Sequence, residues 1–203
     1  MIVLHYTAME DCTKALDWLC NPEAEVSAHY LIDRDGTLIQ MVEEDMRAWH
    51  AGAGGWGGRG DVNSRSIGIE LANTGAEPFA EPQMARLDML LEALLHRWSI
   101  PVHGVIAHSD MAPGRKIDPG PRFDWARLAR LGLAQATPKA MPTTPDPNAF
   151  ETLLTQLGYP EAASEARLNA FRLRHTPRAT GDLSATDMGL AQALVSSVFK
   201  YPN

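Results

Sequence analysis

Two histidines and one aspartate could together hold a metal ion that activates water. His5 ends a predicted short strand that begins at Ile2, and His108 ends a second predicted strand, which runs over Val102–Ala107 and leads into it. Side chains at the carboxyl ends of neighbouring strands converge on one edge of a sheet, where open α/β folds place their sites. Asp118 comes ten residues after His108. Two imidazoles and one carboxylate leave the fourth position of a tetrahedral zinc ion open, as a catalytic site requires.

The segments that must position these residues alternate between strand and helix patterns. A helix is predicted over roughly residues 10–20, and a hairpin pairs 27–32 with 37–42 around an Asp-Gly turn. Residues 66–71 alternate as a strand, and apolar residues from Met84 to Trp98 recur at helical spacing. Strands alternating with helices predict an α/β fold around one sheet.

The glycine-dense stretch 51–60 allows two interpretations. It could pass close to a ligand or adopt positive φ, or it could be a disordered surface loop. It is not a phosphate-binding motif, because no Gly-Lys-Ser/Thr follows it.

A change of composition predicts a second, smaller module. Residues 136–148 contain four prolines, as in a semi-rigid linker, and 149–203 carry helical apolar spacing consistent with three helices. We therefore expect a domain at 1–135, a linker at 136–148 and an all-helical module at 149–203.

Charge and hydropathy exclude some classes of partner. The formal net charge of −7 argues against a nucleic-acid partner, and no apolar run is long enough to cross a bilayer. The first five residues include no basic segment of the kind that begins a signal peptide, and a histidine already follows at position 5, so no signal peptide is predicted. The missing leader favours the cytoplasm, whereas the appended helical module favours the periplasm or cell envelope.

Several motifs, in this order, closely resemble the amidase-2 family of N-acetylmuramoyl-L-alanine amidases, which includes AmpD-like and AmiD-like bacterial amidases and the peptidoglycan recognition proteins. The resemblance covers roughly residues 2–134. The matching stretches are Val3-Leu4-His5-Tyr6-Thr7, Ala28 to Gly36, Ala48-Trp49-His50-Ala51-Gly52, Asn63 to Glu70, Ala107-His108-Ser109-Asp110 and Lys116-Ile117-Asp118-Pro119-Gly120. The segment after the linker is more weakly similar to the peptidoglycan-binding-type domain of AmiD-like members. The resemblance implies a central mixed β-sheet flanked by helices.

The resemblance also implies one zinc ion per chain, held by His5, His108 and Asp118. It makes Glu70 the general base and places Lys116 beside the scissile carbonyl. Structural alternatives remain open: Glu70 could be a surface residue of its strand, Lys116 a solvated side chain and Asp118 a turn residue.

Four further residues could contact the substrate: His29, His50, Asn63 and Arg65. Alternatively, His29 is a hydrogen-bonded histidine of the sheet and His50 packs against Trp49.

The predicted function is hydrolysis of the amide between N-acetylmuramic acid, including 1,6-anhydro forms, and L-alanine, in cell-wall remodelling or recycling. The alternative is a non-catalytic protein that recognises peptidoglycan; catalytically silent relatives typically lack a zinc ligand, whereas this chain keeps all three. The preference between intact murein and released fragments, the stem-peptide length and the oligomeric state remain open.

Overall fold

Five strands form one mixed sheet in the order β3-β2-β4-β1-β5. In the computed structural model, which describes residues 1–200, β1 (Ile2–Tyr6) lies between β4 (Ile67–Leu71) and β5 (Val105–Ala107) and runs parallel to both. Next to β4 comes the parallel β2 (Tyr30–Ile32), which pairs antiparallel with β3 (Leu38–Gln40) as the predicted hairpin. The expected mixed sheet is confirmed.

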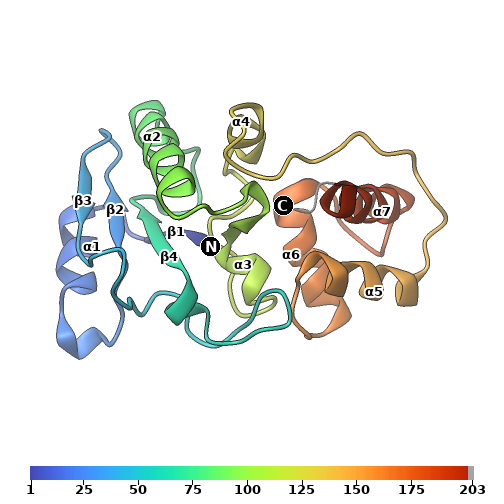
Figure 1. The fold of residues 1–203 in the computed structure, drawn as a ribbon, viewed down its shortest axis with the longest axis horizontal. Helices are drawn as coiled ribbons and strands as arrows, with labels where there is room; N and C mark the ends of the chain where they lie inside the picture. Colours follow the sequence, from blue (N-terminus) through green and yellow to red (C-terminus); the bar gives the residue numbers. More distant parts are fainter. Residues whose placement is uncertain (201–203) are drawn as a thin grey trace.

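The alternation of side chains along the strands separates a structural face from a functional one. Ile2 and Leu4 of β1 face the helix α2 (Glu81–Arg97) in the largest core cluster, together with Ile67, Ile69 and Leu71 of β4. On the opposite face, α1 (Cys12–Leu19) packs against Leu31, and α3 (His108–Met111) lies beside β5. Figure 1 shows α1 and α2 on the two sides of the strands. The intervening positions of β1 and β4, which include His5 and Glu70, therefore point away from α2.

The strand before His108 is shorter than predicted. Residues Val102–Gly104 form a 3-10 turn, closed by a hydrogen bond from the Gly104 amide to the Pro101 carbonyl (2.7 Å), and only Val105–Ala107 pair with β1. His108 is thus the first residue of α3 rather than the last of a strand. Two other 3-10 turns span Pro22–Ala24 and Val62–Arg65.

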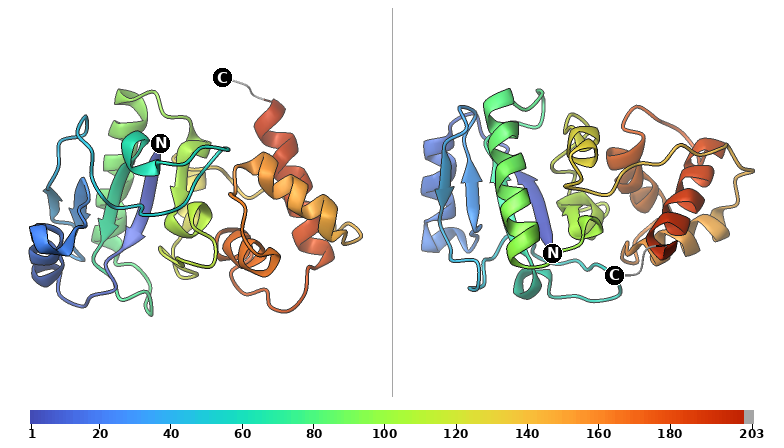
Figure 2. Two further views of the ribbon diagram at one scale, coloured as in Figure 1. Left: turned by 90° about the horizontal axis from the view of Figure 1, so that it is seen from below. Right: turned by 45° about the horizontal axis from the view of Figure 1, so that its top comes forward.

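Three helices at the other end of the molecule enclose a separate core (Figures 1 and 2). They are α5 (Pro147–Leu157), α6 (Ser164–His175) and α7 (Ala185–Lys200), and α4 (Trp125–Arg130) precedes them. Helix α5 begins two residues earlier than expected, since the Asp146 side chain accepts the Ala149 amide and proline is tolerated in a first helical turn. Across residues 1–200, none of the helices is both long and apolar enough to span a bilayer.

Candidate active site

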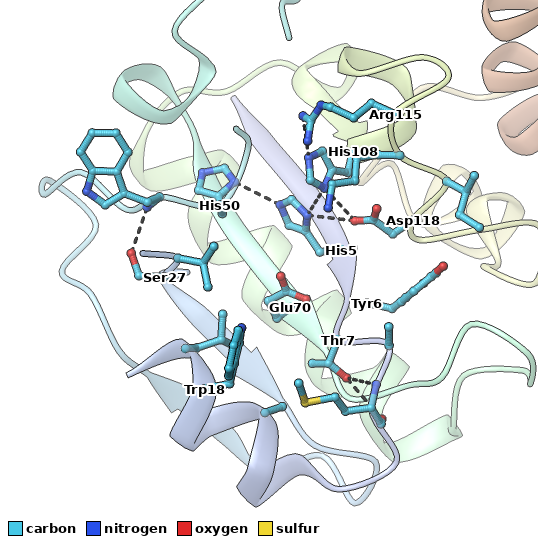
Figure 3. Close-up of a pocket in the computed structure, with 18 residues that line it drawn as sticks. His5, Tyr6, Thr7, Trp18, Ser27, His50, Glu70, His108, Arg115 and Asp118 are labelled. Carbon is cyan, nitrogen blue, oxygen red and sulfur yellow. Dashed lines mark hydrogen bonds and ion pairs between the residues drawn. The ribbon is translucent and has the colours of Figure 1, made fainter. Parts of the chain in front are cut away.

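Three donor atoms from distant parts of the chain converge at the carboxyl end of the sheet. His5 Nδ1 lies 2.8 Å from His108 Nδ1 and 3.0 Å from Asp118 Oδ2, and His108 Nδ1 lies 2.9 Å from the same oxygen. All three residues are buried. Figure 3 shows the two imidazoles and the carboxylate turned toward one point.

The fold explains why these residues meet. His5 belongs to β1, His108 starts α3 directly after the neighbouring strand β5, and Asp118 lies in the loop that follows α3. This loop folds back onto the helix, where the Ser109 amide donates to the Asp118 carbonyl (3.0 Å). Strand β1 and the helix that follows its neighbour β5 thus supply the two histidines, and a short return loop supplies Asp118.

The hydrogen-bond partner of Nε2 decides which ring nitrogen of His108 carries the proton. His108 Nε2 lies 2.9 Å from the carbonyl oxygen of Ala51, which can only accept a hydrogen bond. His108 Nε2 therefore carries the proton, and in the neutral ring Nδ1 presents a lone pair toward His5 and Asp118.

A chain of hydrogen bonds places the proton on His5 in the same way. The Ser66 hydroxyl donates to the Val62 carbonyl (2.5 Å), so its oxygen accepts from His50 Nε2 (3.2 Å). His50 Nδ1 is then an acceptor for His5 Nε2 at 3.1 Å. His5 Nδ1 is left with its lone pair pointing toward Asp118.

Two imidazole lone pairs and a carboxylate oxygen about 3 Å apart repel one another unless a cation lies among them. Within residues 1–200, His5, His108 and Asp118 form the one group of three or more potential ligands that could hold a metal ion. The hydrogen bonds on the outer nitrogens are the supporting contacts that metal-ligating histidines require. The donor set and its surroundings therefore fit a divalent cation.

Electrostatics supports ionised Asp118 and neutral His5. Burial raises the pKa of Asp118, but the hydrogen bonds and charges of His108 and His5 outweigh this effect and keep that pKa below its usual value. Burial, together with the charge of His108, lowers the pKa of His5 to about 4. Both residues are thus in their metal-binding protonation states at neutral pH.

Glu70 lies beside this cluster without a hydrogen-bond partner for one of its oxygens. It is the direct register partner of His5, and its buried Oε2 is unsatisfied. Burial, followed by the Asp118 charge, raises the pKa of Glu70 to about 8, against the opposing charge of Lys116. A carboxyl group with such a pKa can both accept and release a proton near neutral pH.

These groups line one pocket with a volume of about 510 Å³. Lys116 and Tyr6 contribute to its walls, and two indoles stand at its rim: Trp18 on α1 is 51% exposed and Trp49 is 54% exposed. His50 also reaches this pocket, although only 8% of it is exposed. The pocket thus joins a polar floor to an aromatic edge (Figure 3).

The other three expected substrate-binding residues are not among those that line this pocket. His29 is buried, and its Nδ1 accepts a hydrogen bond from the Gly68 amide (3.0 Å). Its Nε2 donates a hydrogen bond to the Met46 carbonyl (3.1 Å). Asn63 Oδ1 accepts the amides of His50 (3.0 Å) and Ala51 (2.8 Å). Arg65 donates to carbonyl oxygens of the glycine-rich loop. Asn63 thus supports the backbone of His50, Arg65 supports the glycine-rich loop, and His29 has no ring nitrogen left for a ligand.

Sequence reasoning missed two supporting residues, Ser66 and Arg115. Ser66 lies within the motif that contains Glu70, and Arg115 precedes Lys116. Arg115 Nη2 donates to the Ala51 carbonyl (2.5 Å), the same oxygen that binds His108, and also to the Ala53 carbonyl. No spacing rule connects either residue to its histidine, because the link depends on hydrogen bonds between distant segments.

Comparison with known proteins shows the family to which the chain belongs. Residues 1–121 match the Amidase_2 family, described as N-acetylmuramoyl-L-alanine amidase. The AmiD amidase of Escherichia coli K12 is 33% identical over 96% of this chain and 82% of its own length. The chain therefore belongs to the N-acetylmuramoyl-L-alanine amidase family and is an amidase.

Other relatives match the first half of the chain or its whole fold. A 1,6-anhydro-N-acetylmuramyl-L-alanine amidase, AmpD of Citrobacter freundii, is 45% identical over 52% of this chain and 57% of its own length. The solved AmiD structure from E. coli, in complex with anhydro-N-acetylmuramic acid-L-Ala-D-γ-Glu-L-Lys, has a TM-score of 0.89 at 33% identity, covering 99% of this chain and 89% of that one. AmpDh3 from Pseudomonas aeruginosa, in complex with an anhydromuramic pentapeptide, has a TM-score of 0.85 at 28% identity, covering 100% and 92%. The likeness to both structures includes the helical part.

Proposed function

We propose that this amidase uses one zinc ion, held by His5, His108 and Asp118, to hydrolyse the bond between N-acetylmuramic acid and L-alanine, including 1,6-anhydro forms. One observation carries the proposal. Two imidazole lone pairs and an ionised carboxylate converge within about 3 Å beside a glutamate oxygen that has no partner. Zinc accepts this mixture of nitrogen and oxygen ligands.

Glu70 transfers protons in this reaction, and Lys116 stabilises developing negative charge. When bound, zinc supplies a Lewis acid that polarises the amide carbonyl and makes water easier to deprotonate. Glu70 accepts the proton of the attacking water and delivers it to the leaving nitrogen of L-alanine, a role for which its raised pKa is suited. The ammonium of Lys116, which lines the same pocket, stabilises the negative charge that develops on the carbonyl oxygen.

The substrate class rests on the pocket and on the relatives. The solved AmiD and AmpDh3 complexes hold anhydro-muramic peptides. The pocket of this chain offers a polar floor for an amide and the exposed indoles Trp18 and Trp49 for the apolar faces of a sugar or peptide. We propose muropeptides as the substrate, and the division into 1–135, 136–148 and 149–203 as the domain organisation.

Product analysis tests the proposal. The purified chain is incubated with an anhydro-muramoyl tripeptide and, separately, with intact sacculi, and the products are identified by mass spectrometry. We expect release of free peptide with an L-alanine amino terminus, lost on chelation and restored by zinc. Full activity in metal-free protein would exclude the zinc mechanism. Tight binding without any release of peptide would favour the recognition protein instead.

A further inference from the structure

A buried carboxylate next to the candidate metal ligand His108 has partners on the C-terminal helices. Asp110 on α3 is 0% exposed. Its Oδ1 accepts the hydroxyl of Tyr159 (3.0 Å), and its Oδ2 accepts Nη1 of Arg174 (3.0 Å). Tyr159 follows α5 and Arg174 lies on α6, so both partners come from the helical part of the chain.

The same carboxylate fixes the backbone that precedes His108. Asp110 Oδ2 also accepts the Ala107 amide (2.9 Å), and Ala107 is the last residue of β5. Arg174 donates in addition to the carbonyl of Val105 (3.1 Å) at the start of that strand, and its guanidinium lies 4.1 Å from the ring centroid of Trp125. One arginine of α6 therefore contacts the strand and the turn that carry His108 into the site.

The glycine-rich loop adds a second connection. Trp56 of this loop packs edge-on against Tyr159 with ring centroids 5.2 Å apart, and the Gly57 amide donates to the Gly158 carbonyl (2.9 Å). Gly55 in turn donates to the carbonyl of Met111, the last residue of α3 (2.9 Å). The loop thus lies between α3 and the residues after α5, and its residues Gly52, Gly54, Gly57 and Gly58 adopt the positive φ that one interpretation of the sequence predicted.

We propose that Tyr159 and Arg174 are positioning residues for the metal site, so that the C-terminal helices complete the support of His108. The inference rests on the proposed zinc function. The carboxyl group of Asp110 has no access to water, and Tyr159 and Arg174 supply the donors that satisfy its oxygens. Without them, Asp110 cannot hold the Ala107 amide in place, and the backbone that directs His108 loosens. Outer contacts of this kind tune metal affinity in other proteins.

Two mild substitutions and a matched control test the inference in the full-length chain. Tyr159→Phe removes one hydroxyl, and Arg174→Lys keeps the charge but loses the forked geometry. The control is Arg172→Met on the same helix, which breaks the buried ion pair of Arg172 with Asp187 (2.7 Å) inside the helical part. The measurements are zinc affinity by chelator competition, the absorption spectrum of the cobalt-loaded protein, and hydrogen exchange of the Ala107 amide without metal.

We expect Tyr159→Phe and Arg174→Lys to weaken zinc binding by about tenfold or more, to change the cobalt spectrum and to speed exchange at Ala107. Arg172→Met should lower the melting temperature without these changes. Unchanged zinc affinity in the two folded variants, or an equal loss in the control, would overturn the inference. If the unsubstituted chain binds no zinc, the proposed function fails. The positioning role is refuted separately if the rate of hydrogen exchange of the Ala107 amide is unchanged in the two variants.

Discussion

His5 and Glu70 are direct register partners on the adjacent parallel strands β1 and β4, and both point away from the face covered by α2. A candidate metal ligand and a candidate base are therefore held by the most regular part of the fold. Rigid strands keep such groups in place better than loops do. Four predictions follow from this arrangement and its surroundings.

Glu70→Gln keeps the size of the side chain but removes its ability to accept a proton. We expect kcat to fall by about 10²–10⁴-fold while zinc content and KM stay close to those of the unsubstituted chain. Stopped assays with a muramoyl peptide, together with metal analysis of the same samples, provide the check. An active variant would show that another group accepts the proton.

His108→Ala leaves two protein ligands, and we expect it to abolish stabilisation by zinc. At a zinc concentration about 100 times the dissociation constant, binding should raise the free energy of unfolding of the unsubstituted chain by about 2.7 kcal/mol. Denaturant unfolding with and without zinc measures this gain. His96→Ala, at an exposed position on α2, is the matched control and should retain the full gain.

The stability of the metal-free protein should depend on pH through Glu70. Its pKa is raised from the ordinary 4.5 to about 8, so between these values the folded state holds a proton that the unfolded chain has lost. The folded state then binds more protons, and the contribution of Glu70 to stability falls as the pH rises through this window. His5 acts in the opposite direction, because its pKa is lowered from 6.5 to about 4, but its effect ends near pH 6.5.

Glu70→Gln isolates this contribution, because glutamine does not titrate. Relative to the unsubstituted chain, the variant should become more stable as the pH rises from about 5 to 8, by at most about 1.4 kcal/mol per pH unit. Urea unfolding of both chelator-treated proteins across this range is the measurement. A stability difference that does not change with pH would contradict the raised pKa.

Gly68→Ala should disturb the metal site through His50. A Cβ atom at position 68 would lie 2.3 Å from Cγ of His50, which is too close for the ring to stay where it binds His5. We expect a loss of about 1–3 kcal/mol in the free energy of unfolding and weaker zinc binding. Gly60→Ala is the control, because the nearest atom to its Cβ would be 3.9 Å away. Equal zinc affinity in both variants would argue against the role of His50 in orienting His5.

Local patterns were sufficient to predict the sheet and most of the helices. Alternating apolar residues identify a strand such as Ile67–Leu71 because burial of one face is a short-range requirement, and the Asp-Gly turn identifies the hairpin for the same reason. The family resemblance assigned His5, Glu70, His108 and Asp118 to one site, and the structure places all four around one pocket, while their catalytic and metal-binding roles stay a prediction. The helical spacing after the linker likewise predicted α5, α6 and α7.

Only the tertiary structure decided how these residues are supported. The hydrogen bond to the Ala51 carbonyl decides which nitrogen of His108 carries the proton. The hydrogen bonds of Ser66 and His50 decide the same for His5. Both ring nitrogens of His29 form hydrogen bonds with backbone groups. The contacts of Asp110 with Tyr159 and Arg174 span 49 and 64 residues of chain. The physical reason is that a hydrogen bond depends on distance and direction in space, whereas residue type and spacing report only the local preference for helix, strand or turn.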